Sequence, residues 1–414
     1  MPKSKAEHPP ATAKPAPHAW AFRAGFRRNS FGWQSRPAIA RVKEAVVEIR
    51  KVAKRDTPLA AEGAVIFLEK VSPALAQVDS SSGSIGTAVN NAIATLVPII
   101  AAADVDAAVR AGWLERLFEA FQADDIPYIE SIGDHWGALC AAPAVADEWA
   151  DRLLDTTRLA LNPDRRLGTF FKGSTACLSA LYHAGRYDEV IDVVRAERMW
   201  RYTQWAVKAM VASGRSAEAL RYAEAGRNPS SSDQAIDMAC EEILLRSGML
   251  EEAYQRYGTR ANGMSSHLAT FRAVTKKYPE RPPRDVLMDL VQGSPGQEGK
   301  WFAAAKDAGF LTEAVALARQ SPCDPRTLTR ASRDFAVTQP SFALDVGLLA
   351  LHWLVQGSGY EITSADVIDA WRATAHAAQS AGRTSEVPVL VQRVVDLGGS
   401  RADFVASVLR SARI

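Results

Sequence analysis

A short phrase that closes one helix and opens the next recurs five times between residues 185 and 387. In each copy a small residue precedes a glycine, a glutamate follows four residues later, and Ala or Val comes next. Glycine tolerates the left-handed conformation that ends a helix, and a first-turn glutamate interacts favourably with the helix dipole. We interpret these positions as structural repeat turns: Gly185 with Glu189, Gly214 with Glu218, Gly248 with Glu252, Gly309 with Glu313, and Gly382 with Glu386.

The spacing of these turns predicts the fold class. Successive glycines are 29, 34, 61 and 73 residues apart. The two longer intervals are near twice a unit of about 30 to 36 residues, so each predicts a degenerate copy inside it. We therefore expect an all-α protein, an α-solenoid of stacked antiparallel helix pairs, with about 65–75% helix where an average protein has about one third.

The best copy, GRYDEV at 185–190, resembles the second half of the tetratricopeptide repeat. The resemblance extends over roughly residues 170–397. The first half of that repeat departs from the family pattern, because its Trp position falls on Ser174 in one copy and on Thr203 in the next. The chain, including RRNSFGWQSRPA at 27–38, also resembles an uncharacterised family of bacterial proteins, which implies no activity.

Composition along the chain predicts four parts. Residues 1–19 are rich in Pro, Ala and Lys and predict a disordered basic tail. Residues 20–36 alternate aromatic residues with Arg and Gly and predict an aromatic and basic strap. Amphipathic stretches over 37–165 predict an N-terminal helical block similar to HEAT repeats, and 166–414 carries the tetratricopeptide-like repeats.

Positive charge is concentrated at the N-terminus. Residues 1–55 hold thirteen Lys and Arg against three Glu, a balance of +10 in a chain whose net charge is +2. One interpretation is that the strap packs its aromatic rings into grooves of the following helices and leaves its arginines in solvent. The alternative is that rings and guanidinium groups contact an anionic partner. The candidate contacts are Arg23, Arg27, Arg28 and Arg36.

Local patterns give little sign of catalysis. The seven histidines are scattered, and the four cysteines form no CxxC pair, which favours reduced thiols. Asp134-His135-Trp136 is the most enzyme-like triplet, but neighbouring helical side chains point apart, so we expect a surface histidine. The Ser/Gly-rich loop 78–87 lacks a P-loop lysine, and we expect Ser82 or Ser84 to cap the next helix. We assign no catalytic, cofactor-binding or metal-binding residue.

These observations favour a non-catalytic protein-interaction scaffold that binds a protein or peptide along a groove lined by the first helix of each pair. The alternative is a nucleic-acid-associated helical-repeat protein that uses residues 20–55, and an enzyme built from distant residues is a third. No segment resembles a signal peptide, and the most apolar run, 92–103, is too short to span a bilayer and contains Pro98. We therefore expect a cytoplasmic protein without a membrane partner.

The repeat turns generate a stability prediction. Replacing Gly214 or Gly248 with valine should lower the free energy of unfolding by about 1–3 kcal/mol, because valine is strained at positive φ. Replacing Glu218 or Glu252 with glutamine should cost only about 0.3–1 kcal/mol, the usual contribution of a first-turn carboxylate. Thermal melts of the four variants check this order, and greater sensitivity at the glutamates would assign those carboxylates to a binding site instead.

Overall fold

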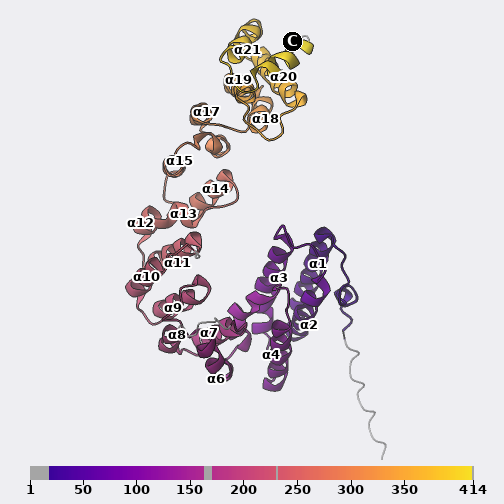
Figure 1. The fold of residues 1–414 in the computed structure, drawn as a ribbon, viewed down its shortest axis with the longest axis vertical. Helices are drawn as coiled ribbons and strands as arrows, with labels where there is room; N and C mark the ends of the chain where they lie inside the picture. The colour runs from indigo at the N-terminus through magenta and orange to yellow at the C-terminus, as the bar shows by residue number, and fades with distance from the viewer. Residues whose placement is uncertain (1–17, 163–169, 230–231, 413–414) are drawn as a thin grey trace, which may run out of the picture. The chain divides into compact units, whose positions relative to one another are not determined.

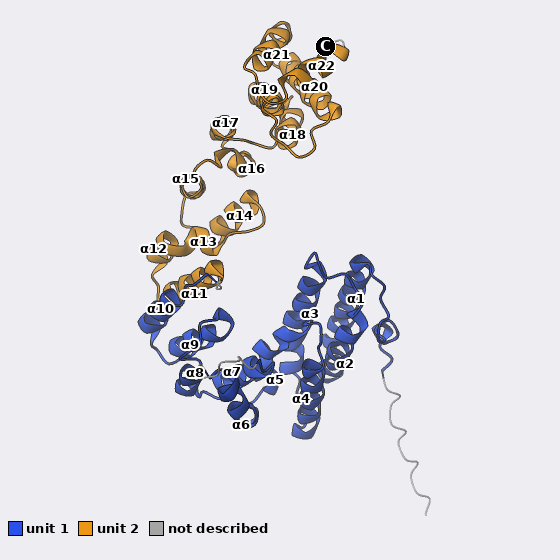
Figure 2. Ribbon diagram, in the orientation of Figure 1, with its two compact units in different colours: residues 1–231 blue, residues 232–414 orange. Residues whose placement is uncertain are grey.

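The computed structural model describes residues 18–162, 170–229 and 232–412, and 73% of these residues are helical with none in a strand (Figure 1). The expected all-α fold and helix content are therefore confirmed for the described residues. The chain divides into two compact units, Met1–Ser231 and Ser232–Ile414 (Figure 2). The expected basic tail, apart from residues 18 and 19, and the expected boundary at 165/166 lie outside the described residues.

The described residues of the first unit begin with the strap and continue through ten α-helices of varied length. Its elements are η1 (Ala21–Ala24), α1 (Ser35–Ala53), α2 (Thr57–Leu75), α3 (Ser84–Ala101), α4 (Ala107–Gln122), η2 (Glu130–His135), α5 (Trp136–Cys140), α6 (Pro143–Ala160), α7 (Ser174–His183), α8 (Tyr187–Val193), α9 (Trp200–Ala212) and α10 (Ser216–Ala225).

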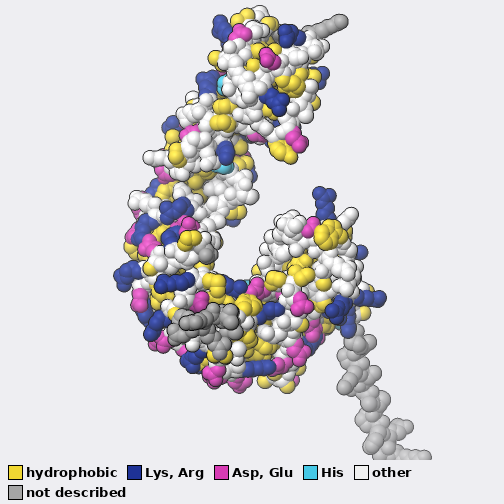
Figure 3. Space-filling view, viewed as in Figure 1, with side chains coloured by type: hydrophobic (Ala, Val, Ile, Leu, Met, Phe, Trp, Pro, Cys, Tyr) yellow, Lys and Arg dark blue, Asp and Glu magenta, His cyan; other side chains and the backbone are white. Residues whose placement is uncertain are grey.

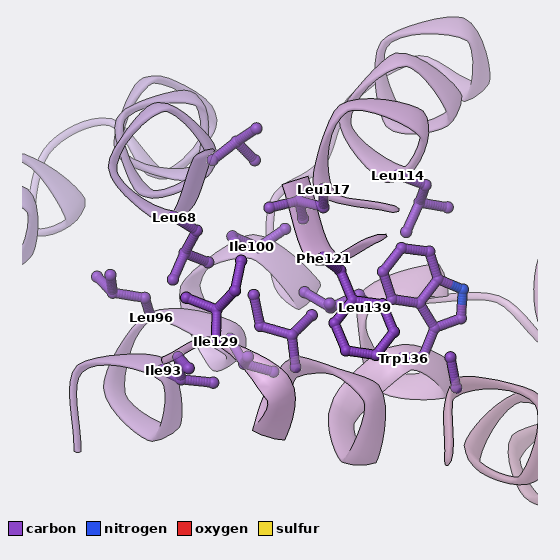
Figure 4. Close-up of a cluster of buried hydrophobic side chains, with 14 of the residues drawn as sticks. Leu68, Ile93, Leu96, Ile100, Leu114, Leu117, Phe121, Ile129, Trp136 and Leu139 are labelled. Carbon is purple, nitrogen blue, oxygen red and sulfur yellow. The ribbon is translucent and has the colours of Figure 1, made fainter. Parts of the chain in front are cut away.

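Helices α1, α2 and α3 pack on one another, and the apolar faces of α2 to α5 meet in one core. Figure 4 shows this core, in which Leu68 of α2, Ile100 of α3 and Phe121 of α4 are all buried. Arg110 of α4 is also buried, and its guanidinium donates to the carbonyls of Ile100 (2.8 Å) and Leu139 (3.3 Å). These bonds add a side-chain donor to carbonyl groups near the ends of α3 and α5.

The boundary between the two compact units falls at 231/232, inside the predicted repeat region. The predicted division at 165/166 lies on residues outside the described ranges and stays a prediction. The physical reason for the boundary at 231/232 is helix α7, whose residues from Ser174 to Leu181 are all buried against η2, α5 and α6. Because a helix buried on all sides belongs to the core around it, the first repeat turns continue the N-terminal block.

Helix α3 is the one helix of the described chain that is long and apolar enough to cross a membrane. Of its 18 residues, 44% are buried inside the protein. The sequence suggested an apolar run too short to cross a membrane, and the helix is longer because it begins at Ser84. Its buried residues, among them Val89, Ile93 and Leu96, contribute to the core of the first unit. This burial is typical of a core helix in a soluble protein.

The second unit contains helices on both sides of the repeat turns at Gly248, Gly309 and Gly382, and further helices in the long intervals between these turns. Its elements are α11 (Asp233–Arg246), α12 (Leu250–Ala253), the π-helical turn η3 (Tyr254–Gly258), α13 (Thr259–Ala261), α14 (His267–Lys277), α15 (Pro283–Gln292), η4 (Glu298–Trp301), α16 (Phe302–Asp307), α17 (Leu311–Gln320), α18 (Pro325–Phe335), α19 (Pro340–Gln356), α20 (Ser364–Ser380), η5 (Thr384–Glu386), α21 (Val387–Asp396) and α22 (Ala402–Ser411).

Helices occupy both long intervals between the repeat glycines. The interval before Gly309 holds α14 and α15, which are separated by a proline-rich turn. The interval after Gly309 holds α18, α19 and α20, which pack on one another. Gly347 of α19 permits this close approach, because a Cβ there would lie 2.5 Å from Thr374 Oγ1 and 2.8 Å from Ser332 Oγ.

A buried carboxylate links three helices of the second unit. Glu241 of α11 is fully buried and accepts hydrogen bonds from Asn262 Nδ2 (2.7 Å), Lys277 Nζ (2.6 Å) and Tyr278 Oη (2.6 Å). Burial and this carboxylate together raise the pKa of Tyr278. A buried charge is tolerated only when partners satisfy it, so the three donors fix α11 against the segments that carry them.

Candidate functional site

The five repeat glycines have φ between 70° and 82°, as the turn interpretation requires. In each turn the residue after the glycine donates its N–H to a carbonyl five residues earlier, as in Arg186 to Leu181 (3.0 Å) and Arg383 to Ala378 (2.8 Å). This is the Schellman pattern, which satisfies a carbonyl at the helix end. The turns therefore perform a structural task, and three of the five lie in the second unit.

The repeat glutamates form ion pairs near their own turns. Glu189, Glu218 and Glu386 each pair with the arginine that follows the turn glycine, at 2.6, 2.7 and 2.8 Å. Glu252 pairs with Arg256 (2.5 Å), and Glu313 pairs with Arg284 (2.7 Å). The arginine partners lower the pKa values of Glu218 and Glu386. These carboxylates fasten turns and neighbouring helices.

The strap is anchored by aromatic rings. Trp20, Phe22 and Phe26 are buried, and both phenylalanine rings contact Phe67 of α2 edge to face. The indole of Trp20 packs directly on Gly63, where a Cβ would lie 2.2 Å from the ring. The packing of these three rings is what the intramolecular interpretation of the strap predicts.

A carboxylate of α1 also holds the strap. Glu48 accepts hydrogen bonds from the backbone N–H groups of Ala21 (2.8 Å) and Phe22 (3.1 Å). It thereby satisfies amides at the start of η1, which would otherwise lack partners. The strap is thus fixed to α1 by backbone as well as side-chain contacts, and its first turn is a short 3₁₀ helix rather than fully extended chain.

Trp33 departs from the expected anchoring of all five aromatic residues in the strap. Its side chain is 72% exposed, although its carbonyl accepts from the N–H of Asp79 (2.9 Å). Phe31 is half-buried against Phe26. Trp33 remains in solvent because its backbone joins the α2–α3 loop while the grooves around Phe67 are occupied by Phe22 and Phe26.

The strap and α1 form a basic surface, which we define by exposed Arg and Lys side chains. Arg23, Arg27, Arg28 and Arg36 are all exposed, and none forms an ion pair with another described residue. Dark-blue side chains are visible over η1 and α1 in Figure 3. The exposed cations that extend this surface are Lys43, Arg50 and Lys51 of α1, and Lys54 and Arg55 just after its end.

The serine-rich loop before α3 differs from the expected cap. Gly83 precedes the helix with φ of 68°, and no side chain caps the first turn in the way that we expected of Ser82 or Ser84. The hydroxyl of Ser82 instead accepts from Ser84 N at 3.4 Å, within the loop itself. A left-handed glycine directs the chain into the helix without a conventional cap.

Asp134 and His135 lie in a polar cluster between η2, α7 and α9. His135 is half-buried rather than on a helix surface, because η2 packs against α7. Burial raises the pKa of Asp134 and lowers that of His135. Desolvation also lowers the pKa of Lys208, against the attraction of Asp134. Arg201 of α9 pairs with Glu130 (2.6 Å) beside them. Sequence patterns indicated only two members of this cluster.

The cysteines are placed to remain unreactive. All four are buried and none forms a disulfide with another described residue, and burial raises the pKa of Cys140, Cys177 and Cys323 to about 12. A thiol with such a pKa is un-ionised at neutral pH, and the thiolate is the nucleophile and metal ligand. Within the described ranges, no three His, Cys, Asp or Glu side chains are placed to hold a metal ion.

A groove of about 740 Å³ lies between α18 and α20 in the second unit, and the sequence analysis did not identify it. Arg326, Arg330 and Arg333 line it from α18, while Arg372 and His376 line it from α20. The spacing of the three arginines on one helix was visible in the sequence. The opposing row was not, because its position depends on how α19 brings α18 and α20 together.

No protein-family model matches this chain, and comparison with curated proteins returns no relative. The functional interpretation is therefore built on the residues and contacts described above.

The anchored strap generates a second stability prediction. Removing residues 1–19 should leave the melting temperature almost unchanged, whereas removing 1–35 should lower it, since each buried ring contributes about 1.5–3 kcal/mol. As a matched pair, F26A should cost about 3–5 kcal/mol and W33Q less than about 0.5 kcal/mol, because only Phe26 is buried. Thermal melts measure all four proteins. An unchanged melting temperature for both the 1–35 deletion and F26A would contradict the anchoring.

Proposed function

We propose that this chain is a non-catalytic protein-interaction scaffold in the cytoplasm, and that its partner is a protein or peptide. In this proposal the helix pairs stack as an α-solenoid, with a HEAT-like N-terminal block and tetratricopeptide-like repeats after it. The repeated Schellman turns support it, because they join successive helices by the same rigid geometry. Stacked repeats of this kind present long surfaces on which a partner can bind.

Exposed methionines carry the proposal. The chain has seven methionines, and four of them lie exposed in the second unit. Their side chains are unbranched and polarizable, so they adapt to a partner's surface and are over-used where proteins bind other proteins. The four residues and their exposed fractions are Met238 (53%), Met249 (44%), Met264 (59%) and Met288 (48%).

Contacts within the second unit hold the backbone beside three of these methionines. Met238 follows Asp237, whose buried carboxylate pairs with Arg260 at 3.0 Å, and Met249 follows a repeat-turn glycine. Met264 donates its backbone N–H to Thr270 Oγ1 (2.8 Å). A rigid backbone with flexible apolar side chains reduces the entropy that a binding surface loses when it contacts a partner.

Nucleic-acid binding by residues 20–55 is a second candidate function, and the basic surface favours it. The anchored rings fix the strap while its four arginines stay exposed and without ion pairs. Trp33 adds an exposed ring on which a base can stack. Guanidinium and ammonium groups on such a surface bind phosphates and release condensed counterions.

The scaffold proposal is tested by affinity capture with the immobilised full-length protein and mass spectrometry of what is retained. We expect the M238Q/M249Q/M264Q/M288Q variant to retain its melting temperature but to capture about tenfold less partner, since hot-spot truncations cost 1.4 kcal/mol or more. The matched control V337Q/Y360Q/V389Q/L397Q changes four other exposed apolar residues of the same unit and should capture normally. Equal capture by both variants would exclude the methionines as the contact surface.

The second candidate is tested by fluorescence anisotropy with labelled single-stranded and duplex DNA at several salt concentrations. We expect R23Q/R27Q/R28Q/R36Q to keep the melting temperature and to flatten the log–log salt dependence by about one for each arginine that contacts a phosphate. The control R319Q/R393Q/R401Q/R410Q makes the same charge change in the second unit. Binding that is absent in the wild type, or equally salt-dependent in both variants, would contradict this function.

A further inference from the structure

The groove between α18 and α20 is lined by two facing rows of polar side chains. On α18 the residues 326, 329, 330 and 333 recur at helical spacing, so they share one face. On α20 the residues 366, 369, 372, 373 and 376 do the same. Arg326 and Asp366 meet near the starts of the two helices, so the rows run side by side from that end.

Carboxylates at the starts of the helices are already committed to the fold. Asp324 accepts from Thr327 N (2.9 Å) and caps α18. Asp366 accepts from Arg326 Nε (2.6 Å) and from Thr363 N (2.8 Å). The Arg326 hydrogen bond, followed by the bonds from Thr363, lowers the pKa of Asp366 to about 2. The charges of Asp324, Asp366 and Arg326 are therefore already partnered within the fold, and we do not expect them to bind a ligand.

Arginines farther along the groove retain their charge for a ligand. Neither Arg330 nor Arg372 forms an ion pair with a described residue, and Arg330 donates only to Thr327 Oγ1 (3.1 Å). Arg333 pairs with its chain neighbour Asp334 while 65% of its side chain is exposed, and such exposed pairs contribute little. Asp369 is the one lining carboxylate that neither caps a helix nor pairs with arginine. Cations thus exceed anions at this end of the groove.

The floor between the two rows is low and rigid. Ala373 is buried beneath the groove and extends no further than its Cβ, and Thr329 opposite is half-buried. Behind them Leu328, Val367 and Ala370 are fully buried in the core of the second unit. The backbone that carries the arginines is therefore fixed before a ligand arrives, which reduces the cost of binding.

The chemistry of the two rows selects the ligand. Guanidinium groups pair bidentately with carboxylate and phosphate oxygens. Cations that approach from two helices suit a tetrahedral anion with three free oxygens better than a planar carboxylate with two. A phosphate monoester carries about −1.5 to −2 charges at neutral pH, enough to outweigh the repulsion from Asp369. The groove volume of about 740 Å³ also admits the group that bears the phosphate.

We propose that the groove between α18 and α20 is a binding site for a phosphate monoester, with Arg330 and Arg333 of one helix and Arg372 of the other as its ligands. The phosphate is carried either by a phosphorylated side chain of another protein or by a free nucleotide. Thr329 and His376 lie in the same groove and supply further hydrogen-bonding groups. This site is independent of the exposed methionines and of the basic strap.

Isothermal titration of the full-length protein tests the site with three probes: a phosphoserine peptide, the same peptide unphosphorylated, and AMP. We expect at least one phosphorylated probe to bind and the unphosphorylated peptide to bind about tenfold more weakly or not at all, because charge-assisted hydrogen bonds are lost. Tighter binding of the phosphopeptide identifies a modified protein as the source of the phosphate, and tighter binding of AMP identifies a nucleotide. Either result supports the site.

Variants locate the binding within the protein. R330Q/R372Q should lower the affinity for the phosphorylated probe by about tenfold or more. The melting temperature of this variant should stay unchanged, because neither arginine forms an ion pair with another described residue. R393Q/R410Q removes two exposed arginines elsewhere in the second unit and should bind like the wild type. The proposal is overturned if no phosphorylated probe binds, if the unphosphorylated peptide binds as tightly as the phosphopeptide and AMP do, or if both variants bind equally well.

Discussion

The Schellman turn is the interaction on which the repeated part of the fold depends. A glycine at positive φ lets the next N–H reach back to a carbonyl near the end of the helix, as in Arg215 N to Met210 O at 2.8 Å. The same hydrogen bond is present at the ends of five helices, two in the first unit and three in the second. Both units therefore reverse the chain direction at these points with the same local turn. The ion pair that follows, such as Arg215 with Glu218, adds to this geometry without creating it.

Local rules explain why the helices were predictable. The proline near the start of α1 and of α2, and the glycine at each repeat turn, act within a few residues of themselves. The unit boundary was not predictable in this way. Helix α7 is buried by η2, α5 and α6, and nothing within its own sequence specifies which neighbours will surround it. The exposure of Trp33 likewise depends on Phe22 and Phe26, which occupy the grooves around Phe67.

The candidate sites were less predictable because each joins residues that are distant in the chain. Lys208 reaches the neighbourhood of Asp134 only after α9 has packed beside α7 and η2. Arg372 faces the arginines of α18 only because Gly347 lets α19 approach both Ser332 and Thr374 closely. Sequence spacing can therefore place side chains on one face of one helix, but the opposing face is set by the packing of a third helix.

The two cationic surfaces share one electrostatic cause, although they lie in different units. Near the strap, Glu48 uses its carboxylate on the backbone amides of Ala21 and Phe22. In the groove, Asp324 and Asp366 accept from amides at the starts of α18 and α20. A carboxylate that caps a helix gains hydrogen bonds and a favourable dipole. Asp366 also pairs with Arg326, but neither Asp324 nor Asp366 forms an ion pair with Arg330 or Arg372. Capping thus helps both to build the helices and to leave cations available to an anionic ligand.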